Sequence, residues 1–397
     1  MRFEIYHQLG FRENWNIQSI LEDNTGDGVI ISPRSMDQAK VEKLDNNIKE
    51  KAIFDPQLMN ALAVRKKMAT YDFYPCEIMP GGFETEQYPG YSSICASNCV
   101  SFQDQNDFRC FVIPTRYSGE LPPVFRYTEI LNDHYITPFL TAIDNSGSRK
   151  EIFVELILNS HMIKDVTYSS ELLNWITGIE GITGIYLITE LDSRNKQIND
   201  GNYLYHLLNF INALSQNELK VILGYLNTEA ILLSLANPSI VTIGSFENTR
   251  IYNSKNFVNQ EERTIKRPPT PRLYIPKLLD WIEHPYVELM NTKCPSYIQS
   301  VAQNEYLDLV LDPKYGWHFN KPEPYMHFFI EGSKQLRNIS SLESEDRYCE
   351  ICNIITSAID EYSKLRESGF ELGVFGSYLS GWLTVANLFG NDQGWSR

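Results

Sequence analysis

Short runs of apolar and β-branched residues recur between residues 28 and 246, and each ends at a polar or charged residue. A longer stretch in which apolar residues have helical spacing follows most of these runs. The runs predict strands at residues 28–32, 51–55, 110–114, 152–158, 184–190, 220–225 and 239–246. A further apolar run at residues 307–311 predicts an eighth strand.

The stretches between these runs predict helices at residues 35–50, 169–179, 203–215 and 228–236. Strands that are apolar on both faces and joined by helices form parallel sheets, and about eight such units close a barrel. We therefore expect an α/β fold of the (β/α)8 TIM-barrel type. The alternative is an open, doubly wound sheet. Its dinucleotide-binding form needs a glycine-rich loop after the first strand, where this chain has Ser32-Pro33-Arg34.

Two stretches interrupt the strand–helix pattern. Residues 71–107 are rich in Gly, Pro and Tyr, which predicts a loop inserted on the catalytic face of the barrel. Residues 263–276 are basic and proline-rich, which predicts a linker between a barrel core at 1–262 and a C-terminal part at 263–397. This C-terminal part is expected to be a helical subdomain, with long helices at 325–337 and 347–367.

Composition narrows the function classes. Hydrophobic residues make up 43% of the chain, which predicts a globular protein. A formal charge of −15 excludes coating of nucleic acid or membrane by bulk positive charge, so a nucleic-acid site must be local. The apolar runs fall short of the roughly 20 residues that span a bilayer, and the first ten residues do not resemble a secretory signal. Seven sparse cysteines indicate a reducing compartment, so we expect a soluble, cytoplasmic protein with no membrane partner. Whether it forms a homo- or hetero-oligomer is left open.

Polar residues that end the predicted strands are the first candidates for chemistry, because the active face of a parallel barrel lies at the strand C-termini. They are Arg34, Asp55, Glu155, Glu190, Tyr225, Glu247 and Arg250. Asp55 is the sharpest candidate, since it occupies the last strand position and Pro56 follows it directly. A carboxylate placed in this way serves as a general base or nucleophile once burial or a neighbour adjusts its pKa. Capping of a following helix is the alternative role for Asp55.

Part of the chain resembles the tRNA-guanine transglycosylases. In residues 224–229 (GYLNTE) the chain is similar to the turn and helix cap of that family, and Thr249-Arg250 looks like its Thr-Arg element. Residues 181–190 resemble the preceding family strand, and Asp55 lies where the first catalytic aspartate of the family is found. The likeness extends in element order over residues 25–365.

The chain also departs from the family pattern. The family's nucleophilic aspartate falls near Gly244, and the nearest carboxylate here is Glu247. Asp55 is followed by Pro-Gln-Leu in place of Ser-Gly-Gly-Phe, and the only Gly-Gly-Phe is at residues 81–83. Tyr-Leu-Ile-Thr at residues 186–189 replaces the family's glycine-rich turn that receives guanine. The family's covalent mechanism therefore lacks its usual nucleophile in this chain.

The resemblance also implies a structural zinc site with three cysteines and a histidine. Cys294 and His327 have the family's separation, but Ser296 and Gln299 replace the other two cysteines. The CxxC at residues 349–352 lies in a predicted helix, where packing of small apolar side chains is the more common role. We therefore expect neither a metal nor a cofactor.

The one concentration of positive charge consists of Arg263, Lys266, Arg267 and Arg272. Because these residues alternate with prolines and precede an aromatic residue, we expect a nucleic-acid backbone to bind there. A solvated linker is the alternative.

Together these features predict a barrel that recognises a nucleobase and cleaves or exchanges it at the N-glycosidic bond in RNA or DNA. In this hypothesis Asp55 is the general acid, base or nucleophile, and Glu190 and Glu247 are its carboxylate partners. Arg34 and Arg250 contact phosphate or base, and Tyr225 is a stacking wall. We expect Asp55, Glu190, Glu247 and Arg250 to line one cavity. The alternatives are a catalytically silent binding subunit and a carbohydrate-active barrel hydrolase.

Overall fold

A computed structural model describes residues 2–59, 67–78, 85–191, 196–257, 268–370, 372 and 376–396. Three of the basic residues predicted to bind nucleic acid, Arg263, Lys266 and Arg267, lie outside the described residues, as does the Gly-Gly-Phe at residues 81–83.

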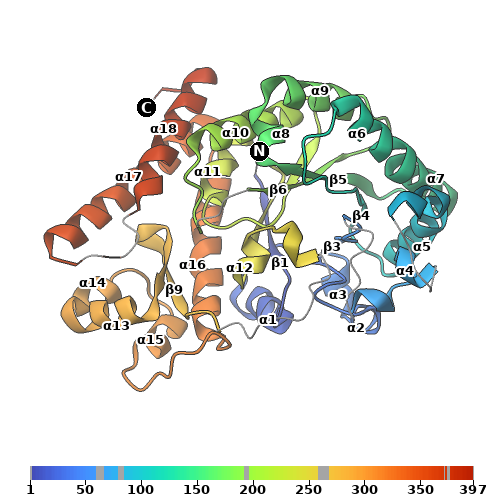
Figure 1. Cartoon of the computed structure of the whole chain (residues 1–397). Helices are drawn as coiled ribbons and strands as arrows, with labels where there is room; N and C mark the ends of the chain where they lie inside the picture. Colours follow the sequence, from blue (N-terminus) through green and yellow to red (C-terminus); the bar gives the residue numbers. More distant parts are fainter. Residues whose placement is uncertain are drawn as a thin grey trace.

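Eight parallel strands form one sheet in the order β3-β2-β1-β8-β7-β6-β5-β4. The strands are β1 (Glu4–Gln8), β2 (Gly28–Ile31), β3 (Ala52–Phe54), β4 (Cys110–Ile113), β5 (Glu151–Asn159), β6 (Gly184–Glu190), β7 (Lys220–Leu223) and β8 (Ile240–Gly244). The two ends of this order, β3 and β4, lie next to each other, and the backbone N–H of Arg109 donates to the carbonyl of Ala52 at 3.0 Å. The sheet is therefore a nearly closed barrel, which confirms the predicted (β/α)8 fold (Figure 1).

Helices cover the outside of the barrel. They are α1 (Glu13–Asp23), α2 (Gln38–Glu42), α3 (Asn46–Lys49), α4 (Pro75–Ile78), α5 (Ser92–Gln105), α6 (Val124–Leu131), α7 (Thr137–Ser146), α8 (Ser160–Lys164), α9 (Val166–Thr177), α10 (Gly201–Gln216), α11 (Ala230–Leu233) and α12 (Glu247–Arg250). Residues 71–107 are expected to form a loop, and this expectation is wrong for residues 92–105, which form α5. Because Cys95, Cys99 and Phe102 of α5 are buried, this helix is part of the barrel wall between β3 and β4.

A glutamine side chain completes the seam between β3 and β4. The amide of Gln103, on α5, accepts a hydrogen bond from the backbone N–H of Val112 at 2.8 Å and donates to the carbonyl of Val112 at 3.1 Å. Both residues are buried. The amide thus satisfies polar groups on the edge of β4 that lack a strand partner, and such groups are costly to bury unpaired.

The eighth strand lies at the start of the chain, and the predicted strand at residues 307–311 is wrong. β1 pairs with β2 on one side and with β8 on the other. Residues 307–311 belong instead to α15 (Glu305–Leu311), whose N-terminus is capped by the side chain of Asn304, which accepts from the N–H of Leu307 at 3.0 Å. Of this apolar run, Leu307 and Val310 are buried, a spacing of three residues that suits a helix.

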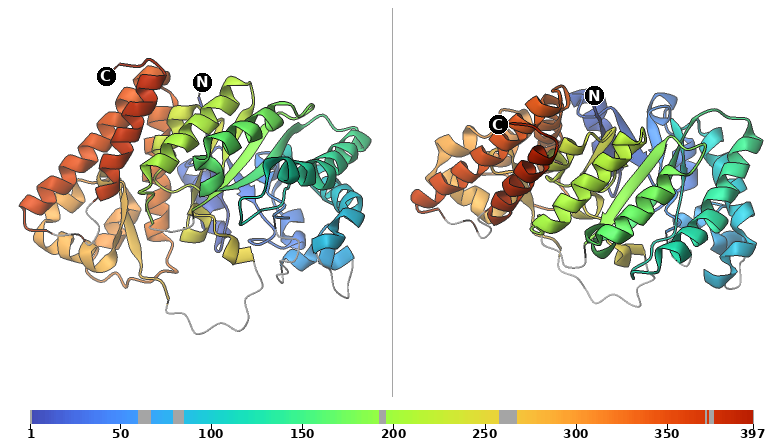
Figure 2. Two further views of the ribbon diagram at one scale, coloured as in Figure 1. Left: turned by 45° about the horizontal axis from the view of Figure 1, so that its top comes forward. Right: turned by 90° about the horizontal axis from the view of Figure 1, so that it is seen from above.

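The C-terminal part is mostly helical, as predicted. It contains a hairpin of β9 (Arg272–Ile275) and β10 (Asp280–Glu283), and the helices α13 (His284–Lys293), α14 (Pro295–Gln299), α15, α16 (Glu323–Ser340), α17 (Ser344–Glu367) and α18 (Ser377–Asp392). Figures 1 and 2 show this part, in orange and red, on one side of the barrel, where α16 contacts α1 and α18 contacts α10. None of the helices in the described ranges has the length and apolarity required to cross a bilayer.

Arg347 joins this part to the barrel. Its buried guanidinium donates to the carbonyl of Ser234 at 3.1 Å and to the side chain of Asn237 at 2.9 Å, and it lies 5.4 Å from the ring centre of Phe3. On the same helix, Tyr348, Ile351, Ile355 and Leu365 are buried, as their helical spacing predicts. The C-terminal helices therefore pack on the barrel as an integral layer.

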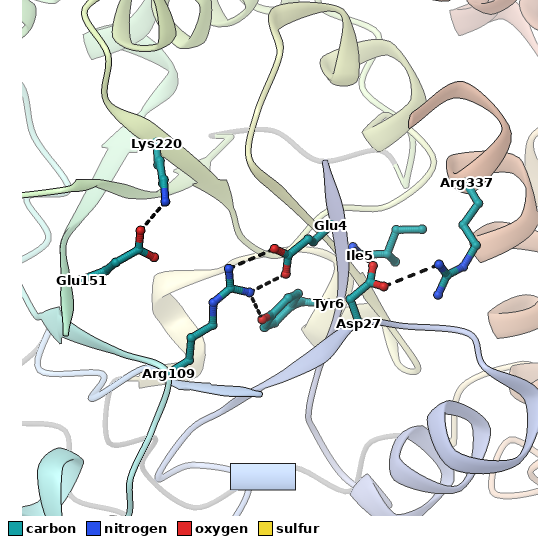
Figure 3. Close-up of polar contacts among 8 residues, drawn as sticks. All are labelled: Glu4, Ile5, Tyr6, Asp27, Arg109, Glu151, Lys220 and Arg337. Atoms are coloured by element: carbon teal, nitrogen blue, oxygen red, sulfur yellow. Dashed lines mark hydrogen bonds and ion pairs between the residues drawn. The ribbon is translucent and has the colours of Figure 1, made fainter. Parts of the chain in front are cut away.

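Ion pairs occupy the end of the barrel at which the strands begin (Figure 3). Glu4, the first residue of β1, accepts two hydrogen bonds from the guanidinium of Arg109, which also donates to the hydroxyl of Tyr6. Lys220 and Glu151, the first residues of β7 and β5, form a second pair. Because these groups satisfy one another, the end of the barrel available for a ligand is the opposite one.

Candidate functional site

A pair of carboxyl groups lies at the end of the barrel where the strands finish. Asp55 follows β3 directly, and its carboxyl group lies within hydrogen-bonding reach of that of Glu155, from β5. Asp55 also accepts from the backbone N–H of Gln57 at 3.1 Å and from the hydroxyls of Tyr186 and Tyr225, each at 3.4 Å. Both carboxyl groups are fully buried. Strands from three sides of the barrel thus place donors around one acidic pair.

Burial and mutual repulsion set the protonation of this pair. Burial raises the pKa of Asp55 to about 7, although the hydrogen bond from the N–H of Gln57 opposes the shift. Burial also raises the pKa of Glu155 well above its usual range, and the neighbouring Asp55 adds to the increase. Two carboxylates in contact do not both ionise readily, so the pair holds a shared proton near neutral pH.

Hydrogen bonds favour the negative charge on Asp55. Asp55 accepts from one backbone N–H and two tyrosine hydroxyls, whereas Glu155 accepts from the N–H of Thr115 at 3.2 Å. Donors directed at a carboxylate stabilise its ionised form. When the pair holds one proton, that proton therefore resides mainly on Glu155.

A cavity of about 380 Å³ opens beside the pair and contains two of the predicted binding residues. Arg34 and Tyr225 line it, together with Gln57 and Lys67. Gln57 and Tyr225 also contact Asp55, so they connect the cavity to the buried carboxyl group. Arg34 and Lys67 place two positive charges at this opening of an otherwise acidic chain.

The backbone at Gln57 and Tyr225 is in the left-handed region, with φ of 55° and 57°. This conformation costs a non-glycine residue on the order of 1 kcal/mol or more and is often found at functional sites. The preceding Gly224 is needed for a different reason. A Cβ at that position would lie 2.6 Å from a ring carbon of Tyr186. The turn therefore depends on close packing against Tyr186, which in turn positions the Tyr186 hydroxyl at Asp55.

The structure places the other predicted carboxylates elsewhere. Glu190 accepts from the backbone N–H of Ser254 at 2.7 Å and from its hydroxyl at 2.9 Å, so it anchors the segment after α12. Glu247 and Arg250 line a second cavity of about 630 Å³, which Arg272 also lines. Among the described cavities, none contains Asp55 together with Glu190, Glu247 and Arg250.

The carboxylate partner of Asp55 is Glu155, to which we assigned no role from the sequence. The sequence feature that points to Glu155 is a single acidic residue within the apolar, buried run of residues 152–158. Burial of a carboxylate without a partner costs free energy, so an acid at such a position is expected to have one. The helix-cap alternative for Asp55 is not supported in residues 56–59, which are not helical. The side chain of Asp55 instead accepts from the N–H of Gln57 in a turn.

The residues that the resemblance associates with zinc do not fit a zinc site. One ring nitrogen of His327 lies 2.9 Å from the carbonyl of Tyr274, and the other lies 2.9 Å from the side-chain amide of Asn304. Cys352 is buried on α17, where its thiol lies 3.7 Å from the side-chain oxygen of Asn387. Across the ranges that the structure describes, no group of three or more His, Cys, Asp or Glu side chains could hold a metal ion.

The fold and the site define a (β/α)8 barrel with a buried carboxyl pair at the end where its strands finish. Comparison of the chain with protein-family models and with curated proteins finds no match. The chemistry of the site therefore carries the functional argument.

Proposed function

We propose that this protein is an acid–base enzyme that recognises a nucleobase and cleaves or exchanges it at its N-glycosidic bond. The observation that carries the proposal is the fully buried, adjacent pair of Asp55 and Glu155, in which burial raises the pKa of both carboxyl groups. An acid with a pKa near the working pH is the most effective proton donor to a leaving group. Departure of a base is such a step, because protonation of a ring nitrogen or carbonyl neutralises the leaving base.

Tyr225 provides a path for this proton. It lines the cavity, and its hydroxyl lies 3.4 Å from Asp55 and accepts from the amide of Gln57 at 2.9 Å. In the proposed step the hydroxyl donates its proton to the leaving base and is reprotonated by the acidic pair, whose shared proton passes from Glu155 through Asp55. The remaining carboxylate then stabilises the positive charge that develops on the sugar.

Recognition of a base and its phosphate is supported by the residues around the cavity. The side-chain amide of Gln57 and the hydroxyl of Tyr225 match the donor and acceptor edges of a nucleobase. Arg34 and Lys67 provide local positive charge for a phosphate, which the net charge of the chain does not. The resemblance of residues 220–250 to transglycosylases supports the same substrate class. The odd and sparse cysteines support a cytoplasmic location.

The geometry favours this proposal over a carbohydrate hydrolase. Glycosidase carboxyl groups are roughly 5 to 10 Å apart, so that a sugar or water fits between them. The carboxyl groups of Asp55 and Glu155 lie within hydrogen-bonding reach of each other, which suits proton sharing instead. A catalytically silent binding subunit remains the second candidate, and the departure from the family pattern near Gly244 favours it.

The test is release of base from a panel of nucleosides, nucleoside monophosphates and short RNA and DNA strands, measured by chromatography and mass spectrometry. We expect wild-type protein to release a base, and Asp55→Asn and Glu155→Gln each to lower the rate by about 10²-fold or more. Asp280→Asn is the matched control, because Asp280 is also buried but bonds to Gln197 and Tyr362 in the C-terminal layer. Binding of a base without its release would favour the silent subunit. The absence of both binding and release across the panel would overturn the proposal.

A further inference from the structure

A second cavity, of about 630 Å³, lies between the end of β8 and the C-terminal layer. Arg250 from α12 lines it on one side, and Arg272 and Trp281 from the β9–β10 hairpin line it on the other. Tyr325 and Lys196 also contribute to its wall. A volume of this size suits a small organic ligand, since such sites commonly measure about 300 to 1,000 Å³.

The side chain of Arg250 is buried in this cavity, and two of its three guanidinium nitrogens have no acceptor among the residues that the structure describes. Its side chain is 8% exposed, and its guanidinium lies 3.8 Å from the ring centre of Trp281. Within the described part of the chain, Nε and Nη1 of Arg250 have no acceptor, and neither does the indole N–H of Trp281, which is 7% exposed. Burial lowers the pKa of Arg250 to about 10, so the group stays charged at neutral pH. A buried charge with unpaired donors is costly unless an anion binds to it.

The nearby carboxylates do not satisfy these donors. Glu247 lines the same cavity but is exposed, and its interaction with Arg250 is electrostatic without a hydrogen bond. Glu229 also acts on Arg250 electrostatically, but its carboxylate accepts from the N–H of Asn227 at 3.0 Å. Glu283 forms its ion pair with Arg272, at 2.6 Å. Among the described residues, no acceptor therefore satisfies Nε and Nη1 of Arg250 or the indole N–H of Trp281, and a ligand in the cavity would supply one.

We propose that this cavity binds the phosphate group of a nucleotide, with Arg250 and Trp281 donating to the phosphate oxygens. The planar guanidinium matches the geometry of phosphate oxygens, and the loops after the last strands of (β/α)8 barrels commonly bind phosphate. The aromatic rings of Tyr325 and Phe246, whose centres are 4.8 Å apart, provide an apolar wall for the nucleoside. This inference does not depend on the chemistry of Asp55 and Glu155.

The second cavity is a neighbour of the first. Asn248 lines both, because it lies on α12 between the end of β8 and Arg250. A free nucleotide and one phosphate of a longer strand both present the chemistry that Arg250 requires. The experiment therefore includes both sources.

Isothermal titration calorimetry tests the inference with AMP, adenosine, inorganic phosphate and a short single-stranded oligonucleotide as probes. We expect AMP or the oligonucleotide to bind with Kd below about 1 mM, and adenosine to bind at least about tenfold more weakly than AMP. Arg250→Met is expected to weaken binding of the phosphorylated probe at least about tenfold. Trp281→Phe, which keeps an aromatic ring and removes only the indole N–H, is expected to weaken it about threefold to tenfold. The probe whose affinity falls in Arg250→Met shows whether the phosphate belongs to a free nucleotide or to a longer strand.

Two variants serve as controls. Tyr274→Phe removes the hydroxyl group of a buried ring that lies next to Trp281. Because Tyr274 does not line the cavity, this variant should leave the affinity unchanged. Asp55→Asn should also leave it unchanged. Equal affinity of wild type, Arg250→Met and Trp281→Phe would overturn the inference, as would the failure of every phosphorylated probe to bind. Loss of binding in Asp55→Asn alone would place the ligand at the first cavity, overturning this inference while supporting the proposed function.

Discussion

The side-chain amide of Gln57 donates to the hydroxyl of Tyr225 at 2.9 Å, and both residues have left-handed backbone conformations. The two residues are 168 positions apart and follow β3 and β7, so this bond crosses the mouth of the barrel. Each also contacts Asp55. Backbone strain at two positions is thus associated with the geometry around one carboxyl group.

Removal of the Tyr225 hydroxyl is expected to impair catalysis and to shift its pH dependence. The hydrogen bond from Tyr225 lowers the pKa of Asp55, so Tyr225→Phe should raise that pKa further. We expect kcat/KM for base release to fall at least about tenfold, and the limb of the pH–rate profile that reports Asp55 to move to higher pH. Tyr205→Phe is the control, because the Tyr205 hydroxyl bonds to Asp392 on the surface. An unchanged profile in Tyr225→Phe would contradict the proposed proton path.

Asp55→Asn should make the protein more stable above neutral pH relative to wild type. The pKa of Asp55 is raised from 3.8 to about 7, so between these values the folded state binds more protons than the unfolded state. The free energy of unfolding of wild type therefore falls as pH rises through this range, by up to about 1.4 kcal/mol per pH unit from this group. We expect the free energy of unfolding of the variant, minus that of wild type, to increase by roughly 1 to 3 kcal/mol between pH 5 and pH 8. Urea unfolding at each pH measures this difference. The exposed Asp144→Asn should show no such gain, and a gain of equal size there would refute the assignment.

Gln103→Met is expected to weaken the barrel at its seam. The substitution removes both hydrogen bonds to Val112 and leaves a buried N–H and carbonyl unpaired. Each unpaired buried group costs about 1 to 3 kcal/mol, so we expect a loss of roughly 2 to 5 kcal/mol in the free energy of unfolding. Gln105→Met, at an exposed position of the same helix, is the matched control. Equal stability of the two variants would show that the seam does not need the amide.

Gly224→Ala should displace Tyr186 and disturb the acidic pair. The added Cβ would lie 2.6 Å from Cε2 and 2.9 Å from the hydroxyl of Tyr186, which donates to Asp55. Overpacking of this kind costs about 1 to 3 kcal/mol, and we expect a lower Tm together with reduced base release. Gly381→Ala is the control, because a Cβ there meets nothing within 4 Å and the residue lies in α18. That variant should be neutral or slightly more stable.

Arg347→Lys should destabilise the barrel and the C-terminal layer together. The guanidinium donates to carbonyls of Ser234, Ile339 and Leu342, and an ammonium group does not reproduce this planar arrangement. We expect a loss of about 2 to 5 kcal/mol within one cooperative unfolding transition, monitored by tryptophan fluorescence and circular dichroism. Arg366→Lys, exposed on the same helix, should change stability little. Separate transitions for the two parts would show that they fold independently.

Seven of the eight strands can be predicted from the sequence because each is a run of apolar residues buried on both faces. β1 could not be predicted in this way, since Glu4, His7 and Gln8 interrupt its apolar pattern. Residues from other elements contact two of these side chains. Glu4 pairs with Arg109, and the side-chain oxygen of Gln8 lies 3.3 Å from the hydroxyl of Tyr186. Such partners are distant in sequence, so only the folded chain shows that a polar strand completes the barrel.

The sequence by itself determined that Asp55 ends a strand, because that position follows from a local run of residues. It also determined the βα alternation, since apolar periodicity is a local property. Only the tertiary structure decided which carboxyl group meets Asp55. Glu155 lies within β5, and its approach to Asp55 depends on the curvature of the whole sheet, whereas Glu247 on α12 faces a different cavity. Contacts across a barrel depend on closure and stagger, which join residues about a hundred positions apart.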